Sequence, residues 1–250
     1  LWQWQEELPS GSSAGKRGRS MIEIMGNSLC FGVMISVAAY EIGVLLKKKF
    51  KLAIFNPLLI AIAVIIVILA ITGVEYVTYI DGAKYLSYLL TPATVCLAVP
   101  LYEQLEILKK NLKAILAGIL AGALTSVTSV LILAILFGLS HEEYVTLLPK
   151  SITTAIGMGV SEELGGIVTI TVAVIIITGV LGNMFAEAVC RIFWIEEPIA
   201  KGIGIGSASH AIGTAKAMEL GDIEGAMSSL SIAVSGLITV ILASVYAQFL

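Results

Sequence analysis

Apolar residues fall in long runs along this chain, and short polar loops separate the runs. A helix needs roughly 20 mainly apolar residues to cross about 30 Å of hydrocarbon. Six runs meet or approach that length. They cover residues 24–46, 52–73, 85–102, 112–137, 167–190 and 227–249. Together with the segments between them, these runs predict an all-α polytopic membrane protein with seven or eight transmembrane segments.

Three stretches interrupt this pattern and predict broken or re-entrant helices. Pro92 and Pro100 fall inside the third run, where a proline removes a backbone hydrogen bond and clashes with the preceding turn. Residues 147–165 are too polar and too short for a full crossing, so we expect them to enter the membrane and return. Residues 209–230 hold a histidine, a lysine, three acids and three glycines. Such groups are tolerated at membrane depth where they face protein or a water-filled cavity.

The placement of basic residues favours seven crossings and one re-entrant segment. Lys and Arg near helix ends mark the cytoplasmic side. Residues 47–51 and 109–113 are both lysine-rich, and two predicted crossings separate them. Arg191 and Lys201 also lie on the cytoplasmic side only if residues 147–165 do not cross the membrane.

The chain also shows weak internal similarity. Residues 63–73 (AVIIVILAITG) resemble residues 173–182 (AVIIITGVLG), with an offset of about 110 residues. We interpret this as two repeats, about 21–138 and about 145–250. An odd number of crossings between equivalent elements would make the repeats inverted, an architecture that holds substrate between paired broken helices. The alternative is that two apolar helices rich in β-branched residues resemble each other by composition.

Composition agrees with a bilayer as the solvent. Hydrophobic residues make up 58% of the chain, charged residues make up 13%, and the mean hydropathy is +0.97, which lies outside the usual range of soluble domains. We therefore expect one transmembrane domain over residues 21–250. Residues 1–20 are polar and rich in Ser and Gly, and we interpret them as an appended or disordered segment, with a native tail as the alternative.

Charge and cysteine content narrow the function classes. The net charge of −3 and the scattered basic residues do not indicate a nucleic-acid partner. Cys30, Cys96 and Cys190 are far apart and surrounded by apolar residues, which fits neither a disulfide framework nor a metal site. We predict no metal and no cofactor.

Ser209, His210, Gly213 and Thr214 lie where a glycine-rich run is expected to give way to a helix. The N-terminus of a helix that begins at a break attracts an anion, particularly a carboxylate. An unperturbed histidine titrates near neutrality, so His210 is a candidate for proton coupling. The alternative for His210 is a structural hydrogen bond.

A second candidate group follows Pro149, a residue type that favours a helix start. Lys150, Ser151, Thr153 and Thr154 supply a cation and hydroxyl donors. We expect this group to line the same substrate site.

The first broken segment supplies a third group, because Thr91 and Thr94 flank Pro92 and mirror the position of Ser209 and His210. We expect the three polar breaks to converge on one anion. Glu41 is an intramembrane carboxylate and a second candidate for proton coupling, although its nearness to lysines makes a paired or snorkelling role an equal alternative.

Other charged residues of the same region predict structural roles. Lys216 and Glu219 are three residues apart and predict an ion pair on a helix surface. Asp222 and Glu224 predict a solvated turn or a helix cap.

Three motifs of the chain, taken in order, resemble the LrgB/CidB family of bacterial membrane proteins, which includes antiholin-like proteins. The motifs are LLTPATVCLAVPLYEQL, LPKSITTAIGMGVSEELGGI and SASHAIGTAKAMELGDIEGAMSSL. They also resemble the C-terminal half of the plastid glycolate/glycerate transporter. The similarity covers nearly all of residues 21–250. It departs from the family pattern at Ala155, where a proline is expected after the paired threonines.

The resemblance implies a multi-pass protein of the bacterial plasma membrane with a small LrgA/CidA-type membrane partner. It also implies two functions. One is transport of small monocarboxylates such as pyruvate, glycolate or glycerate, with proton coupling as a hypothesis. The alternative is antiholin-like regulation of murein hydrolase activity or export and of autolysis. We expect the bilayer, a small organic anion and a further copy of the chain as partners. The sequence carries no HExxH motif, and GxSxG occurs only as GSSAG at residues 11–15, in the polar segment left out of the fold, so we do not expect an enzyme.

Overall fold

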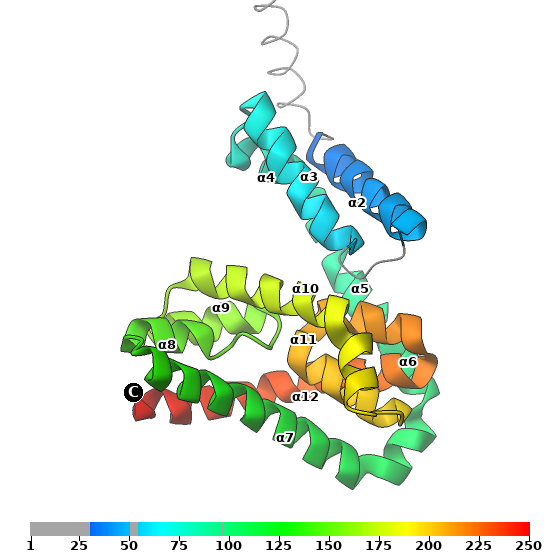
Figure 1. The fold of residues 1–250 in the computed structure, drawn as a ribbon, viewed down its shortest axis with the longest axis vertical. Helices are drawn as coiled ribbons and strands as arrows, with labels where there is room; N and C mark the ends of the chain where they lie inside the picture. Colours follow the sequence, from blue (N-terminus) through cyan, green and yellow to red (C-terminus); the bar gives the residue numbers. More distant parts are fainter. Residues whose placement is uncertain (1–30, 51–54, 97) are drawn as a thin grey trace, which may run out of the picture. The chain divides into compact units, whose positions relative to one another are not determined.

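The structure is a computed structural model that describes residues 31–50, 55–96 and 98–250. It divides into two compact units, residues 1–91 and 92–250. Every regular element in the described part of the chain is helical (Figure 1). The predicted appended segment, residues 1–20, and the start of the first apolar run lie outside the described residues.

The first unit contains α2 (Phe31–Phe50), α3 (Pro57–Thr72) and α4 (Tyr76–Ser87). The Asn56 side chain accepts hydrogen bonds from the first free N–H groups of α3, and Gly73 ends that helix in the left-handed conformation. α2 packs against α3 and α4 at two glycines, because Gly43 lies against Pro57 and Gly32 lies against the α4 backbone. The crossing predicted over residues 52–73 is, among the described residues, the 16-residue helix that begins at Pro57 and ends at Thr72.

The third apolar run is interrupted, as its prolines predict. α4 ends at Ser87, before Pro92, and the helix resumes at Leu90 after a short turn. The described residues beyond it are helical as α5 (Leu90–Cys96) and α6 (Ala98–Glu103), on either side of residue 97, which lies outside the described residues. α6 packs against α12 in the second unit.

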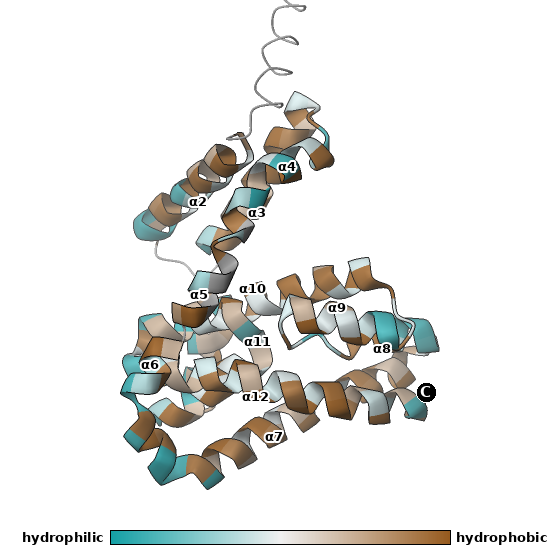
Figure 2. Ribbon diagram, turned by 180° about the vertical axis from the view of Figure 1, so that it is seen from behind, coloured by the Kyte–Doolittle hydropathy of each residue, from teal (hydrophilic) through white to brown (hydrophobic). Residues whose placement is uncertain are grey.

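The second unit contains α7 (Leu105–Phe137), α8 (His141–Leu147), α9 (Thr154–Glu163), α10 (Val168–Ile192), α11 (Pro198–Leu220) and α12 (Asp222–Tyr246), followed by the short 3₁₀-helix η1 (Ala247–Phe249). Among the described residues, three helices are long and apolar enough to cross a membrane: α7, α10 and α12 with its 3₁₀ extension. Figure 2 shows hydrophobic residues along α7, with hydrophilic residues at its N-terminal end and on α8. The number of crossings and the inverted repeats remain predictions.

α8 and α9 form a hairpin that enters and returns on one side of the second unit. α8 runs against the C-terminal half of α7 in the opposite direction, because Tyr144 packs near Val130 while Lys150 reaches Ser126. α9 then runs back toward the start of α10. Residues 147–165, predicted to be re-entrant, form the tip and second limb of this hairpin, whose first limb begins at His141. Re-entry into the membrane stays a prediction.

Buried hydroxyl groups join the two limbs of this hairpin to α10. The Thr171 hydroxyl lies 2.7 Å from the Ser161 hydroxyl and 2.9 Å from the Thr146 carbonyl oxygen. The Ile167 N–H donates to the Thr146 hydroxyl at 2.8 Å. At the start of α8, the Glu143 carboxylate accepts from the N–H and hydroxyl of Ser140, and these bonds hold the pKa of Glu143 below its usual value.

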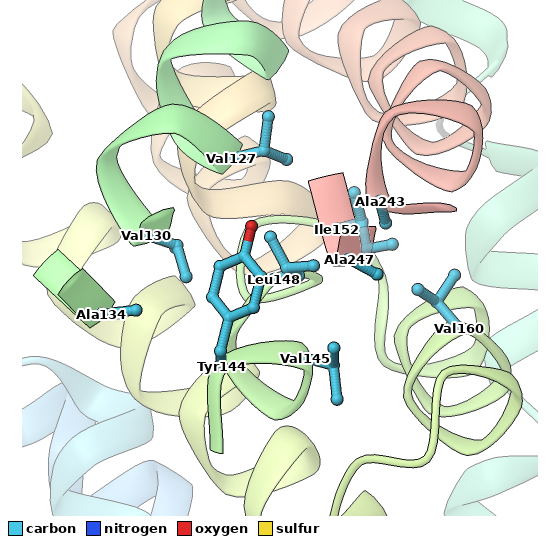
Figure 3. Packing of buried hydrophobic residues seen from close by; sticks show 10 residues of the cluster. All are labelled: Val127, Val130, Ala134, Tyr144, Val145, Leu148, Ile152, Val160, Ala243 and Ala247. Atoms are coloured by element: carbon cyan, nitrogen blue, oxygen red, sulfur yellow. The ribbon is translucent and has the colours of Figure 1, made fainter. Parts of the chain in front are cut away.

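An apolar cluster anchors the hairpin to α7 and to the end of α12 (Figure 3). Tyr144 is fully buried at its centre, and its phenol donates to the Tyr246 carbonyl oxygen at 2.9 Å. The other buried members are Val127, Val130, Ala134, Val145, Leu148, Ile152, Val160, Ala243 and Ala247. The hairpin therefore has a fixed position within the second unit.

α11 reverses direction at His210, which has φ 43° and ψ −143°. The first limb, residues 198–209, runs parallel to α12, because Gly202 lies beside Glu224 and Gly206 lies beside Ser228. Both positions require glycine. A Cβ added to Gly202 would lie 2.5 Å from the Glu224 carbonyl oxygen, and a Cβ added to Gly206 would lie even closer to the Ser228 carbonyl oxygen.

The second limb, residues 211–220, runs antiparallel to α12. The Thr214 and Ser228 hydroxyls are hydrogen-bonded at 2.7 Å, and Met218 lies against Gly225. α11 is thus a second hairpin, and both of its ends lie beside the start of α12. The expectation that the glycine-rich run precedes the helix is wrong, because that run is itself helical.

The two hairpins enter the second unit from opposite ends. α8 begins beside the C-terminal end of α7, whereas the first limb of α11 packs against Ile115 and Ile119 near the N-terminal end of α7 (Figure 1). Lys201 is two residues from Ile203 of this apolar cluster, and Arg191 lines a cavity together with Lys201, so both lie toward the same end of the unit as the lysines at residues 109–113. The seven-crossing topology stays a prediction.

We expect Thr171→Val to loosen the α8–α9 hairpin, because a valine keeps the shape of the side chain and removes its hydroxyl bonds. The free energy of unfolding should fall by about 1–2 kcal/mol. The measurement is thermal unfolding of the purified protein in detergent. Thr72→Val is the matched control, because the Thr72 hydroxyl bonds to carbonyl oxygens of its own helix. Equal stability of the two variants would contradict the role given to Thr171.

Candidate functional site

The tips of the two hairpins meet at a cavity of about 580 Å³, which we call the tip cavity. Lys150 and Ser151 reach it from the α8–α9 tip. Ser207 and Ser209 reach it from the end of the first limb of α11. Gly204 and Ala208 of the first limb also line it. One face of α7 and the middle of α10 complete the wall, with Gly122, Thr125, Ser126, Ser129, Thr178, Leu181 and Gly182.

Lys150 supplies the charge of the tip cavity. Its ammonium donates to the Ser151 hydroxyl at 2.9 Å and to the Ser126 hydroxyl at 3.4 Å, and these two hydroxyls are 3.0 Å apart. Lys150 forms no ion pair with an acid in the part of the chain that the structure describes. A cation in apolar surroundings is costly without a counter-charge, so this arrangement favours an anion in the cavity.

Hydroxyl groups line the tip cavity around Lys150. Besides the two serines bonded to it, they come from Thr125, Ser129, Thr178, Ser207 and Ser209. A hydroxyl both donates and accepts hydrogen bonds. The cavity can therefore bind a small anion that also carries polar groups. In the described chain, no three His, Cys, Asp or Glu residues gather in a way that could hold a metal ion.

His210 secures the reversal of α11. Its Nε2 lies 3.0 Å from the Ile175 carbonyl oxygen, and its ring is buried against Gly179 of α10. A carbonyl oxygen can only accept, so Nε2 carries a proton in this contact. His210 does not line the tip cavity, and this geometry supports the structural alternative that the sequence left open.

Two further side chains hold the backbone beyond the reversal. The Asn183 amide donates to the Ile212 carbonyl oxygen at 2.7 Å. The Thr214 hydroxyl donates to the His210 carbonyl oxygen at 3.0 Å. Lys216 lies farther along the second limb and pairs with Glu187 and with Glu219, which confirms the predicted Lys216–Glu219 pair.

The structure brings together three of the predicted substrate residues, Lys150, Ser151 and Ser209, at the tip cavity. Gly213 packs against Ser209, and Thr214 is buried behind the reversal. Thr153 and Thr154 lie at the start of α9 and are not part of the cavity wall.

Two local predictions are wrong. The helix expected directly after Pro149 begins at Thr154, because residues 148–153 form the turn that places Lys150 at the tip. Glu224 is buried, so its prediction in a solvated turn is wrong. It lies in the first turn of α12 with its carboxylate beside the N-cap residue Gly221, so the alternative of a helix cap is not contradicted.

The remaining predicted residues are not placed at the tip cavity. Thr91 and Thr94 belong to α5, and their side chains lie outside the described residues. Glu41 lies on an exposed face of α2 in the first unit. The convergence of Thr91 and Thr94 with the other two polar breaks remains a prediction. So do the roles of Glu41 and His210 in proton coupling.

Sequence reasoning missed the contribution of α7. Gly122, Thr125, Ser126 and Ser129 follow helical spacing and occupy one face of an otherwise apolar crossing. That stripe of small and hydroxyl residues is visible in the sequence AGALTSVTSV. Its pairing with Lys150 depends on the tertiary structure.

The sequence model of the LrgB-like family matches residues 36–249 of the chain. The chain belongs to the LrgB-like family. The antiholin-like protein LrgB of Bacillus subtilis (strain 168) is 37% identical to it over 221 residues, which cover 88% of this chain and 96% of the relative. Proteins of the same name from Bacillus mycoides (strain KBAB4) and Bacillus cereus (strain B4264) are 38% identical over the same shares.

No solved structure matches this LrgB-like chain. The family match and the three membrane-length apolar helices agree on a membrane protein. The predicted family resemblance is confirmed.

We expect Gly182→Ala to destabilise this LrgB-like protein and Gly204→Ala to leave its stability nearly unchanged. A Cβ on Gly182 would collide with the Ser209 side chain beside the reversal, whereas a Cβ on Gly204 meets nothing within 4 Å. Overpacking of this kind costs about 1–3 kcal/mol. Thermal unfolding in detergent gives the comparison, and equal stabilities would contradict the close approach of α10 and α11.

Proposed function

We propose that this LrgB-like protein has an antiholin-like role in the bacterial plasma membrane, and that the activity behind that role is carriage of small monocarboxylates. The first part rests on its relatives, which are named antiholin-like proteins. The second part rests on the tip cavity. In this role the protein would regulate murein hydrolase activity or export and autolysis together with a small LrgA/CidA-type membrane protein.

The observation that carries the transport part is the ammonium of Lys150. It lies at the meeting point of two hairpins that enter from opposite ends, it is held by two hydroxyls, and it has no acidic partner in the described chain. Carriers of the inverted-repeat type bind substrate near the membrane midplane at discontinuous helices. A single cation supports binding of a monocarboxylate, and the surrounding hydroxyls support binding of its oxo or hydroxyl group.

A second candidate keeps the antiholin-like role and omits transport. In it, the protein acts by contacts with its small membrane partner, and the tip cavity has no ligand. The names of the relatives favour the regulatory role without indicating its mechanism, so an experiment on transport separates the two candidates. Proton coupling and self-association belong to the proposal as further expectations.

We expect Lys150→Met to abolish carboxylate uptake, because methionine keeps much of the side-chain length and removes the charge. Loss of a charged hydrogen bond predicts roughly 10- to 100-fold weaker binding. The measurement is uptake of labelled pyruvate, lactate, glycolate and glycerate into proteoliposomes, with and without an inward proton gradient. A dye-leakage assay excludes passive leak.

Lys110→Met is the matched control, because Lys110 is exposed near the N-terminal end of α7. It should transport at the wild-type rate. If neither the wild type nor its mixture with the small LrgA/CidA-type partner takes up any of the four acids, carriage is contradicted. Equal uptake by Lys150→Met and the wild type would instead remove the tip cavity as the site.

The link between transport and regulation has its own test. In a strain lacking its own relative of this protein, we expect wild-type protein to change the autolysis rate and Lys150→Met to leave it unchanged. Equal membrane levels of the two proteins are the control. Full regulation by Lys150→Met, measured together with its loss of uptake, would favour the contact-based candidate.

A further inference from the structure

The tip cavity is the first of three cavities that adjoin one another along α10. A middle cavity of about 190 Å³ and an outer cavity of about 460 Å³ follow it. Gly182, Gly204, Ala208 and Ser209 line both the tip cavity and the middle cavity. Cys190, Ile195 and Lys201 line both the middle cavity and the outer cavity. The three cavities therefore lie next to one another in a series between α10 and the first limb of α11.

This series leads from the middle of α10 to its end. Gly182 and Arg191, which line its inner and outer parts, are separated by about 14 Å along the helix axis at 1.5 Å per residue. The outer cavity is bordered by Trp194, which is 83% exposed directly after α10. Tryptophan and arginine at the end of an apolar helix are typical of the membrane–water interface.

Charge along the series is positive at its inner end and balanced at its outer end. Lys150 lies at the inner end. Lys201 lines the middle and outer cavities and forms no ion pair in the described part of the chain. The outer cavity is also lined by Arg191, which pairs with Glu187, and by a second acid, Glu196.

We propose that these three cavities are the route by which a small carboxylate passes between the tip cavity and the membrane surface at the C-terminal end of α10. This route rests on the proposed carriage of monocarboxylates. It assigns Lys201 as the cation at the outer part of the route, and the junction lined by Gly182, Gly204 and Ser209 as its inner passage.

Gly204 offers a direct way to block the route. An added Cβ on Gly204 meets no atom within 4 Å, so a larger side chain there would grow into the shared wall of the two cavities. Ala200 lies in the wall of the middle cavity alone, away from Lys150. A side chain enlarged at Ala200 would obstruct passage and leave the tip cavity unchanged.

The experiment measures uptake of the same four labelled acids by proteoliposomes of Gly204→Phe and Ala200→Phe. We expect both variants to lose about tenfold or more of the wild-type rate. Gly159→Phe is the control, because Gly159 also has open space around its Cβ and lies on α9, outside all three cavities. It should transport normally.

Binding separates a blocked route from a damaged site. Calorimetric titration with the best-transported acid should give Ala200→Phe the wild-type affinity in spite of its lost uptake. Wild-type uptake by both phenylalanine variants would overturn the route and leave the proposed function intact. Absence of uptake by the wild type would overturn the proposed function, and the route with it.

Cys190 supplies a second readout that needs no bulky substitution, since it lines the middle and outer cavities. In a variant with Cys30→Ser and Cys96→Ser, the anionic thiol reagent methanethiosulfonate ethylsulfonate should modify Cys190 and block uptake. An excess of transported acid should slow this modification. A modified Cys190 that still supports full uptake would contradict the route.

Discussion

The need to hydrogen-bond every backbone group inside a membrane is the constraint on which the second unit depends. Both hairpins interrupt regular helix at their tips, and hydrocarbon offers no water to bond the freed N–H and carbonyl groups. At the reversal of α11, the Asn183 amide and the Thr214 hydroxyl donate to backbone carbonyl oxygens. At the α8–α9 tip, the backbone N–H groups of Lys150 and Ile152 donate within the turn. Polar contacts within the protein therefore stabilise both reversals.

Ile175 shows how these contacts connect the two hairpins. Its side chain packs against Gly157 in α9, and its carbonyl oxygen meets His210 at the reversal of α11. His210 adopts a backbone conformation that costs on the order of 1–3 kcal/mol outside glycine. The bond to Ile175 and the close packing against Gly179 offset that cost and fix the two tips relative to one another.

The fixed tips give the Lys150 ammonium a defined environment. The serines that bond it come from α7 and from its own turn, so the charge points into the tip cavity before any ligand arrives. Such preorganisation lowers the cost of binding a small anion. The glycines and alanines between α10 and α11 leave space there for the middle cavity beside the tip cavity.

The sequence by itself determined the helical class, the membrane-length runs, the break in the proline-containing run and the family, because apolar length and motif order are local properties. It also indicated Lys150, Ser151 and Ser209. The reversal of α11 was decided by the tertiary structure, since residues 199–220 contain no proline and the turn depends on the distant Ile175 carbonyl and on Asn183. The same packing placed His210 behind the cavity and brought the hydroxyl face of α7 to Lys150, because residues far apart in the chain meet there.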